Sequence, residues 1–321
     1  MIDSSYRYII LSAGQEWNLY SWESTKNDSN IEFYNELFRP LLLKKFWWRT
    51  YFKSKFLCRI IWFPYFRRLL KIDKRKTILI VYDWHYLTMS SYIVQSFKRM
   101  YNNLTIVYCF TNLSKVTGAK TFGLLDNLKD SYDQVYAFDK LDSERYGFDY
   151  SRLVYAPVRH DYLINCVQEL DLFYVGQAKD RLTQLIDIFK NAQKAGLKCK
   201  FFITGVSEES QYVHPDIVYN QNISYGEVLG YISKSRCIVD AIQGESTGMT
   251  LKTCEAVYWD KKLITTNVNV VNEPYFNSNN IMVYDEKSDL KRFMKLELMP
   301  YTDKDRFIFS PYRLIQQIMT L

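Results

Sequence analysis

Short apolar runs alternate with amphipathic stretches along most of the chain. Residues 77–82 (TILIVY) and 104–110 (LTIVYCF) are continuous apolar runs, as expected of strands buried on both faces of a parallel sheet. Residues 7–12 and 135–138 predict two further strands, and residues 90–101 predict a helix between the first pair. Strands that alternate with helices in this way indicate βαβ units and a parallel sheet.

The same alternation begins again after residues 152–157. Strands are predicted at residues 171–175, 199–204, 237–240 and 262–266, and helices at residues 181–195, 225–233, 249–258 and 310–321. We therefore expect an α/β fold with two Rossmann-like domains joined near residues 155–168. The expected boundaries are 1–157 for the N-terminal domain and 158–309 for the C-terminal domain, with the last helix packing back on the N-terminal domain.

Composition sets limits on the class of protein. The 321 residues are 48% hydrophobic and 24% charged, which is ordinary for a globular protein and excludes wholesale disorder. No stretch of about 18 apolar residues is present, so no membrane-spanning helix is expected, and the polar start of the chain does not resemble a secretory signal. The six cysteines form no C-x-x-C pair, so we expect free thiols in a reducing cytosol and no metal site.

Positive charge is concentrated in one aromatic-rich segment, residues 41–76. The chain carries a net charge of +7, yet residues 44–76 alone contain twelve basic residues against one acid. That stretch has a local charge of +11, and the rest of the chain sums to −4. Aromatic and aliphatic residues are interleaved with the cations at a spacing compatible with a helix.

Three interpretations of this basic segment stay open. A basic helix with aromatic residues binds well to an anionic membrane surface, where Trp47 and Trp48 would enter the headgroup boundary. In that interpretation Arg67, Arg68 and Lys71 would face lipid phosphates. The plainer interpretation is a core helix with one solvated basic face. Nucleic acid is the least favoured partner, because no motif for binding it accompanies the segment.

Candidate ligand-binding residues follow three strands of the second half. In parallel α/β sheets ligands bind outside the carboxyl ends of the strands. Gly176 with Arg181, Gly205, and the loop at residues 243–250 (QGESTGMT) all come directly after predicted strands. The loop combines glycines, hydroxyls and a helix N-terminus, which favours a phosphate, although it matches neither a P-loop nor a dinucleotide fingerprint. The alternative is an N-capped turn with a purely structural role.

Two charged residues follow on the predicted helix at 249–258. Lys252 and Glu255 are three residues apart and therefore share one face of that helix. They are either an exposed ion pair or a ligand-binding pair. In the second case Glu255 accepts hydrogen bonds from a ribose diol and Lys252 neutralises a diphosphate.

The order of these motifs is similar to that of a known family. Residues 171–205 and 225–267 resemble the donor-binding half of GT-B fold glycosyltransferases, most of all the bacterial enzymes of capsule, exopolysaccharide and O-antigen synthesis. Residues 135–157 are similar to the inter-domain region of that group. The resemblance covers about residues 130–270, whereas the first 130 residues agree only in layout.

The resemblance implies two Rossmann-like domains that face each other across a cleft, with a nucleotide-sugar donor held mostly by the C-terminal half. The donor-binding residues that it implies are Gly176, Arg181, Gly205, Thr247, Gly248, Met249, Thr250, Lys252 and Glu255. Residues 218–223 would flank the base. The N-terminal domain would be the acceptor side, for a saccharide or a lipid-linked glycan.

One departure from the family pattern bears on stereochemistry. Many retaining members carry two glutamates eight positions apart, but Thr247 stands eight positions before Glu255. Glu245, ten positions before it, is the candidate to face the donor sugar. Both a retaining and an inverting outcome therefore stay open.

A catalytic base is expected in the N-terminal half, because an inverting transferase must remove a proton from the acceptor hydroxyl. Asp83 and His85 follow the strand at 77–82 and are the first candidates, although His85 is also interpretable as a structural histidine. Asp139 is a further candidate, and His160 and His214 carry less weight. We find no convincing D-x-D metal motif, so we expect no metal and no cofactor.

The sequence therefore predicts a metal-independent glycosyltransferase of bacterial surface-polysaccharide synthesis. It would be cytoplasmic and peripheral on the inner face of the cytoplasmic membrane, with no nucleic-acid partner. Two alternatives are kept: a GT-B-like nucleotide-sugar epimerase, and a non-enzymatic protein that docks to a membrane or a partner through the basic segment.

Overall fold

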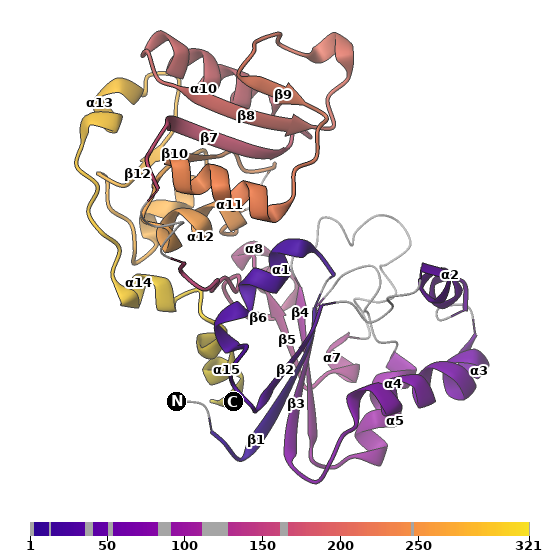
Figure 1. The fold of residues 1–321 in the computed structure, drawn as a ribbon. Helices are drawn as coiled ribbons and strands as arrows, with labels where there is room; N and C mark the ends of the chain where they lie inside the picture. Colours follow the sequence, from indigo (N-terminus) through magenta and orange to yellow (C-terminus); the bar gives the residue numbers. More distant parts are fainter. Residues whose placement is uncertain are drawn as a thin grey trace. The chain divides into compact units, whose positions relative to one another are not determined.

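A computed structural model describes residues 3–12, 14–35, 41–50, 54–82, 91–110, 128–160, 166–244 and 247–320 (Figure 1). The chain divides into two compact units. Unit 1 comprises residues 1–154 and 311–321, and unit 2 comprises residues 155–310. In the described residues each unit contains a six-stranded sheet, and every strand pair in both sheets is parallel. The prediction of an α/β fold with two Rossmann-like sheets is confirmed.

The sheet of unit 1 has the strand order β2-β1-β3-β4-β5-β6. Its strands are β1 (Tyr6–Leu11), β2 (Ile31–Tyr34), β3 (Lys76–Tyr82), β4 (Leu104–Phe110), β5 (Gln134–Ala137) and β6 (Asp149–Tyr150). Ile9 lies opposite Leu79 in the register, and Leu79 lies opposite Ile106, so these three side chains share one face. Ile10 and Ile80 are likewise paired and belong to the core on the other face. The central strands are mostly apolar, as expected of strands that are buried on both faces.

Helices cover both faces of this sheet. They are α1 (Glu16–Ser21), η1 (Glu23–Thr25), α2 (Leu41–Thr50), α3 (Lys55–Leu57), a π-helical turn η2 (Cys58–Trp62), α4 (Phe63–Leu70), α5 (Ser91–Met100), α7 (Leu128–Ser131), α8 (Lys140–Tyr146) and α15 (Pro311–Met319). The π turn, α4 and α5 pack on the face that carries Ile9. The opposite face is covered by α15, through Leu314, Ile315 and Ile318.

The C-terminal helix α15 belongs to unit 1 although unit 2 separates it from the rest in sequence. Besides its apolar face, it forms hydrogen bonds with two strands of the sheet. Gln317 donates to the carbonyl of Tyr150 at 2.7 Å, and Gln134 donates to the carbonyl of Ile318 at 3.4 Å. Unit 1 is therefore built from both ends of the chain.

The sheet of unit 2 has the strand order β12-β11-β10-β7-β8-β9. Its strands are β7 (Leu170–Gln177), β8 (Cys199–Thr204), β9 (Ile217–Tyr219), β10 (Ser235–Asp240), β11 (Lys262–Thr265) and β12 (Ile281–Val283). The chain passes from β7 outward to β9 and then returns to the other side of β7 with β10. This reversal between β7 and β10 is a topological switch point, the place at which such sheets bind ligands.

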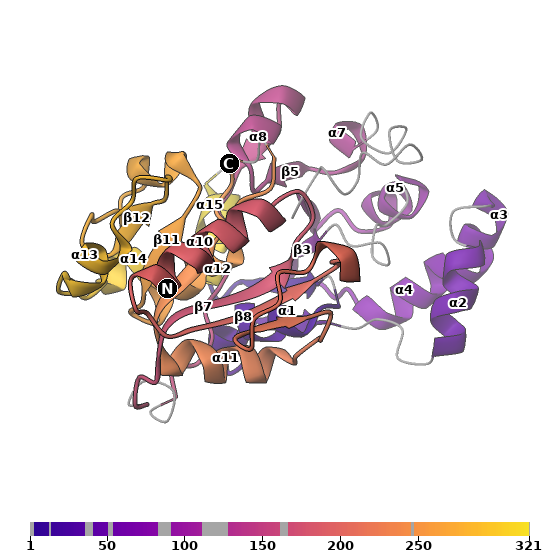
Figure 2. The ribbon, with the colours of Figure 1, turned by 90° about the horizontal axis from the view of Figure 1, so that it is seen from above.

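The helices of unit 2 are α10 (Leu182–Lys194), η4 (Glu208–Ser210), α11 (Tyr225–Lys234), α12 (Leu251–Tyr258), η5 (Val268–Asn272), α13 (Leu290–Lys295) and α14 (Asp303–Phe307). Figure 2 shows α10 and α11 on opposite sides of β7 and β8. Phe189 of α10 packs against Phe201, whereas Tyr231 of α11 packs against Phe173 and Phe202. Alternate residues of each strand thus serve the two faces.

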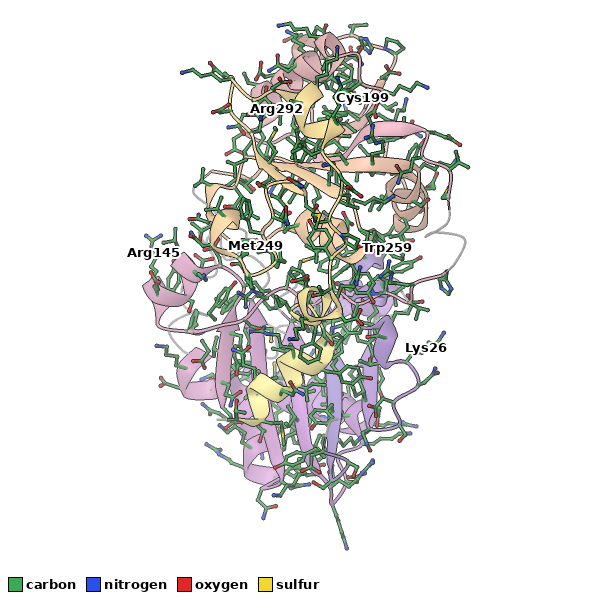
Figure 3. The ribbon with its side chains drawn as sticks, turned by 90° about the vertical axis from the view of Figure 1, so that its left-hand side faces the viewer. Lys26, Arg145, Cys199, Met249, Trp259 and Arg292 are labelled. Carbon is green, nitrogen blue, oxygen red and sulfur yellow. The ribbon has the colours of Figure 1, made fainter. Side chains whose placement is uncertain are left out.

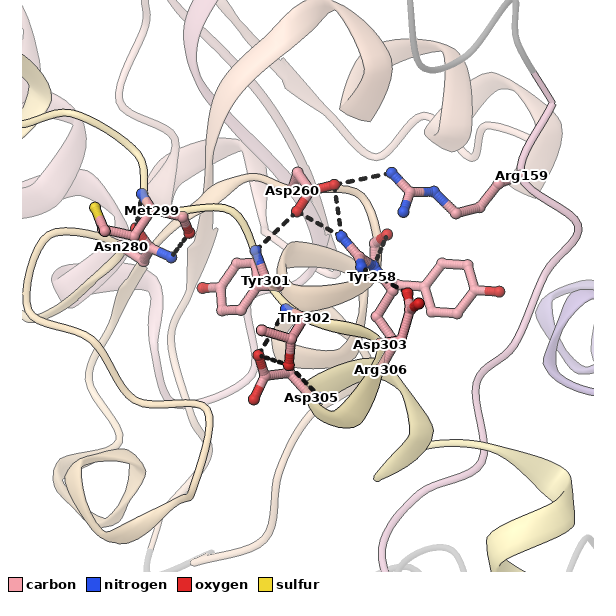
Figure 4. A network of polar contacts seen from close by, with 10 residues as sticks. All are labelled: Arg159, Tyr258, Asp260, Asn280, Met299, Tyr301, Thr302, Asp303, Asp305 and Arg306. Carbon is pink, nitrogen blue, oxygen red and sulfur yellow. Dashed lines mark hydrogen bonds and ion pairs between the residues drawn. The ribbon is translucent and has the colours of Figure 1, made fainter.

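A polar network fixes both ends of unit 2 against the end of α12 (Figure 4). The carboxylate of Asp260 accepts hydrogen bonds from Arg159 at 2.8 Å and from Arg306 at 2.7 Å. The main-chain N–H of Tyr301 also donates to it, at 3.1 Å. Arg159 belongs to the first residues of the unit and Arg306 to the last helix, so one aspartate holds the entering and the leaving chain and anchors α12.

Candidate functional site

Arg181 joins two strand ends at the switch point of unit 2. Its guanidinium donates to the carbonyl of Gln177, at the end of β7, at 2.7 Å and to the carbonyl of Ala241, just after β10, at 2.5 Å. The sequence predicted a phosphate contact for Arg181. The structure places this cation at the switch point and gives it a structural role there, while the phosphate contact stays a prediction.

Gly176 lies beside two side chains from other positions. A Cβ atom added to it would lie 2.9 Å from the Tyr174 hydroxyl oxygen and 3.7 Å from Lys252 Nζ. Lys252 Nζ in turn lies 5.4 Å from the centroid of the Tyr174 ring, a cation–π geometry. The structure therefore brings together Gly176 and Lys252, which the sequence placed in separate motifs, and shows that a side chain at position 176 would collide with Tyr174.

Gly205 forms a turn after β8 with a φ of +74°, a conformation that glycine adopts at no steric cost. The turn is closed by Asn220, whose side chain accepts from the N–H of Val206 at 3.1 Å and donates to the carbonyl of Val206 at 2.7 Å. Asn220 lies within residues 218–223, the segment predicted to flank a base. The Gly205 turn and this segment therefore meet.

The loop before α12 ends in a helix cap. Thr250 accepts a hydrogen bond from the N–H of Thr253 at 3.3 Å, as an N-cap residue does. Gly248 contributes its carbonyl to Asn267 at 3.4 Å. Figure 3 labels Met249, just before α12, and Trp259, just after it. The first N–H groups of α12 and the positive end of its dipole therefore lie directly after the predicted phosphate-binding loop.

Asp240, the last residue of β10, is a buried carboxylate that the sequence interpretation missed. Its Oδ2 atom accepts hydrogen bonds from three threonine hydroxyls: Thr250 at 2.8 Å, Thr253 at 3.3 Å and Thr265 at 3.4 Å. Burial raises the pKa of Asp240, and the charge of Lys252 opposes that shift. The sequence feature that could have identified Asp240 is an acidic residue at the end of an apolar strand, next to the switch point.

Glu255 is buried at the far end of a chain of hydroxyl groups. Its Oε1 atom accepts from the Tyr225 hydroxyl at 2.8 Å, and the hydroxyls of Tyr225 and Tyr155 lie 2.9 Å apart. The indole N–H of Trp259 donates to the Tyr155 hydroxyl at 2.8 Å. Because each hydroxyl can donate only one proton, this order leaves Tyr155 donating to Tyr225 and Tyr225 donating to Glu255. The chain fixes the position of the carboxyl group.

Burial also changes the acidity of Glu255. The side chain is only 2% exposed, and desolvation raises its pKa to about 7, against opposing effects of the Lys252 charge and the Tyr225 hydrogen bond. In the part of the chain that the structure describes, the second oxygen of Glu255 forms no hydrogen bond. The alternative of an exposed ion pair between Lys252 and Glu255 is therefore wrong. The carboxyl group is held inside the unit, where burial raises its pKa.

No family model matches the chain, and no curated protein matches it in sequence. Among solved structures, the Anabaena protein HepE in complex with UDP and glucose is similar, with a TM-score of 0.57, 8% identity and 98% of each chain covered. Sucrose-phosphate synthase from Thermosynechococcus elongatus has a TM-score of 0.55 and 10% identity over 98% of this chain and 97% of its own. The UDP-GlcNAc 2-epimerase from Methanocaldococcus jannaschii has a TM-score of 0.52 and 9% identity over 98% and 99%.

The fold is GT-B-like. The likenesses extend over nearly the whole chain, so both Rossmann-like sheets take part in them. At 8–10% identity they show the fold alone. A synthase and an epimerase are both similar to it, so the fold by itself does not choose between these two kinds of enzyme. The activity has to be inferred from the residues of the candidate site.

Several predicted residues of this GT-B-like protein have no described position. Asp83, His85 and Glu245 lie outside the described residues, so all three catalytic assignments stay predictions. Asp139 caps α8 by accepting from the N–H of Leu141 at 2.9 Å. His214 packs edge-on against Phe189 with ring centroids 4.8 Å apart, which is a structural role. Among the described residues, no group of three His, Cys, Asp or Glu side chains is placed to hold a metal ion.

The basic segment requires one correction. Trp47 is fully buried in the core of unit 1, so the prediction that it faces a membrane is wrong. Arg67, Arg68 and Lys71 are exposed as predicted, and the side chain of Trp48 lies outside the described part. The Trp47 side chain lies inside because α2 packs against the rest of unit 1. In the described residues, no helix has the length and apolar character needed to cross a bilayer.

Proposed function

We propose that the protein is a glycosyltransferase that takes its sugar from a nucleotide-sugar donor, and that the donor binds at the switch point of unit 2. The observation that carries this proposal is the buried carboxyl of Glu255, which lies in the middle of α12. A carboxylate held by Tyr225 is suited to accept hydrogen bonds from a ribose diol. HepE, which has a similar fold, was solved with UDP and glucose.

The charges around the site suit a diphosphate. Lys252 supplies a cation whose ammonium lies near Gly176, and the N-terminus of α12 adds first-turn N–H groups that have no partner within the helix and a positive dipole end. Sugar transfer leaves negative charge on the departing nucleoside diphosphate. Fixed cations and dipoles that face this charge lower the barrier because they need no rearrangement during the reaction. Thr247, Gly248, Met249 and Thr250 remain the proposed phosphate loop.

The second part of the proposal concerns the acceptor of the sugar. We infer a saccharide or lipid-linked glycan of a bacterial surface polysaccharide, supported by the sequence resemblance and by the basic surface of unit 1. Asp83 and His85, which follow β3 in the sequence, are the proposed source of the catalytic base, with Glu245 facing the donor sugar. The second candidate is a nucleotide-sugar epimerase, favoured by the fold that this chain shares with the UDP-GlcNAc 2-epimerase.

Calorimetry with nucleoside diphosphates tests the donor site. The protein is titrated with UDP, GDP and dTDP, of which dTDP already lacks the 2′-hydroxyl, and whichever of UDP and GDP binds is compared with its 2′,3′-dideoxy counterpart. The wild type should prefer the ribose form by about 10- to 100-fold, since a hydrogen bond to a charged group contributes about 1.5–3 kcal/mol. Glu255→Gln should bind both forms with similar affinity.

Glu209→Gln is the matched control, because this glutamate is exposed in the same unit. It should keep the preference for ribose. A preference that survives Glu255→Gln contradicts the assigned role of Glu255, and no binding of any nucleotide by the wild type contradicts the proposed donor site. Product analysis then separates the two activities: an epimerase converts the donor alone, whereas a transferase consumes it only with an acceptor or with water.

A further inference from the structure

Three large apolar side chains are exposed on the basic segment of unit 1. Phe56 is 67% exposed, Ile60 is 50% exposed and Phe46 is 44% exposed. All three belong to the helical stretch formed by α2, α3, η2 and α4, which we name the α2–α4 surface. Single exposed apolar residues are ordinary, but a group of them within one short stretch is a sign of an interaction surface.

The packing of the other face forces these side chains outward. Cys58, Trp62, Phe66 and Leu70 are buried in the core at a strict spacing of four residues. On an α-helix of 3.6 residues per turn, each such step drifts by about 40° around the axis. The π turn at Cys58–Trp62 is wider than an α turn and offsets part of this drift, so the buried stripe keeps facing the sheet. Phe56 and Ile60, also four residues apart, are left on the solvent side.

Helix α2 is fastened to the same π turn. The ring of Phe46 lies 5.8 Å from that of Trp62, and the indole N–H of Trp62 donates to the Thr50 hydroxyl at 3.0 Å. Figures 1 and 2 both show α2 next to α3. The exposed apolar side chains are therefore presented by one packed group of helices.

Cations surround these apolar groups. The exposed basic residues of the surface are Lys45, Lys55, Arg59, Arg67 and Arg68. The one acid between residues 44 and 76 is Asp73, which pairs with Arg75 at 2.8 Å. The α2–α4 surface is therefore strongly positive, in a chain whose remaining residues are negative overall. Its charge is complementary to an anionic partner.

We propose that the α2–α4 surface docks the protein on an anionic phospholipid bilayer. Phe56, Ile60 and Phe46 enter the boundary between headgroups and acyl chains, and the cations contact lipid phosphates. Exposed apolar side chains distinguish this partner from a nucleic-acid duplex, whose backbone phosphates would need the cations alone. The proposal concerns unit 1 only and is independent of the proposed sugar transfer. The proposed membrane-contacting residues differ from those that the sequence indicated. Trp47 is buried and does not belong to them, whereas Phe56 and Ile60 are exposed and do.

Sedimentation of the full-length protein with vesicles tests the proposal. Vesicles of phosphatidylcholine and phosphatidylglycerol in equal parts should bind the protein, and vesicles of phosphatidylcholine alone should bind it at least about tenfold more weakly. Raising the salt from about 0.1 M to about 1 M should weaken binding to the anionic vesicles, since the screening length falls from about 10 Å to about 3 Å.

Two variants probe the two components of the surface. Arg59→Glu with Arg67→Glu should weaken binding to anionic vesicles by about tenfold or more, because each basic residue near the surface contributes about a factor of five. Phe56→Ser with Ile60→Ser should also weaken it by about tenfold or more, through the lost insertion. The matched controls in unit 2 are Lys194→Glu with Lys198→Glu, and Val213→Ser, all at exposed positions, and these should bind like the wild type.

The outcomes separate the partners. Absence of vesicle binding by a wild type with native circular dichroism overturns the proposal. So does binding that depends on the cations and is unaffected by Phe56→Ser with Ile60→Ser, especially with equal binding to a DNA duplex, since this is the behaviour of a nucleic-acid surface. Loss of binding in both double variants, with unfolding curves like that of the wild type, supports membrane docking, whether or not any nucleotide binds to unit 2.

Discussion

The two regions of interest depart from ordinary packing in opposite directions. Around α12, unit 2 buries two carboxyl groups, Asp240 and Glu255, among hydroxyls and next to Lys252. On the α2–α4 surface, unit 1 exposes Phe56 and Ile60 among cations. Burying a carboxyl opposes folding, and a group of large apolar side chains left exposed contributes nothing to folding, so both arrangements indicate another purpose. The first arrangement suits a small polar ligand, and the second suits an extended partner with an apolar interior.

The largest expected effect concerns the pH dependence of stability in unit 2. The pKa of Glu255 is about 7 in the folded protein, against about 4.5 when exposed. Between these values the folded state binds more protons than the unfolded state, so stability falls as the pH rises. A shift of this size corresponds to about 3 kcal/mol. Urea unfolding from pH 5 to pH 7 should show this decline, and Glu255→Gln should reduce it.

The buried Asp240 has a raised pKa as well, so part of the slope should persist in Glu255→Gln. Glu209→Gln serves as the control and should leave the slope unchanged. A wild type and a Glu255→Gln variant with parallel pH profiles would show that the carboxyl is ionised normally in the fold. In that case the contrast between the two regions would rest on the α2–α4 surface alone.

A smaller effect is expected at Gly176. Gly176→Ala places a Cβ atom 2.9 Å from the Tyr174 hydroxyl, so we expect a loss of about 1–3 kcal/mol in the free energy of unfolding. Gly230→Ala is the matched control, because Gly230 lies within α11 and, among the described atoms, a Cβ there meets nothing within 4 Å. That change should stabilise by about 0.5–1 kcal/mol. Equal effects of the two substitutions in urea unfolding would refute the crowding at Gly176.

The sequence predicted the long strands well because they are buried on both faces and therefore read as uninterrupted apolar runs. It missed β2 at residues 31–34, all of which are only partly buried at the edge of the sheet. It also missed the π turn at Cys58–Trp62, and the inward direction of Trp47 follows from how α2 packs on that turn. A helical pattern shows which residues share a face, but not which face the rest of the protein will cover.

The candidate site shows the same division. Gly176 was found because it follows a predicted strand, and Lys252 and Glu255 were found because they share one face of the helix that follows the predicted phosphate-binding loop. The partners of Glu255 were not, since Tyr225 precedes it by 30 residues and Tyr155 lies 104 residues before Trp259. Only the folded sheet brings these segments together, and hydroxyl-bearing aromatics are too frequent in this chain for the sequence to single them out.

The smallest expected effect is that of Phe56→Ser on the stability of unit 1, and it is the sharpest test of the difference between the regions. Phe56 is mostly exposed, so Phe56→Ser should change the free energy of unfolding by no more than about 0.5 kcal/mol. Phe66→Ala, on the buried side of the same helices, should lower it by about 3–5 kcal/mol. Urea unfolding without vesicles measures both. A large loss for Phe56→Ser would mean that the ring packs within the protein and is not available to a membrane. An almost unchanged stability of Phe56→Ser, together with weaker vesicle binding, would mean that the Phe56 ring contributes to binding a partner and not to folding. The polar groups around Glu255, in contrast, are expected to affect both stability and ligand binding.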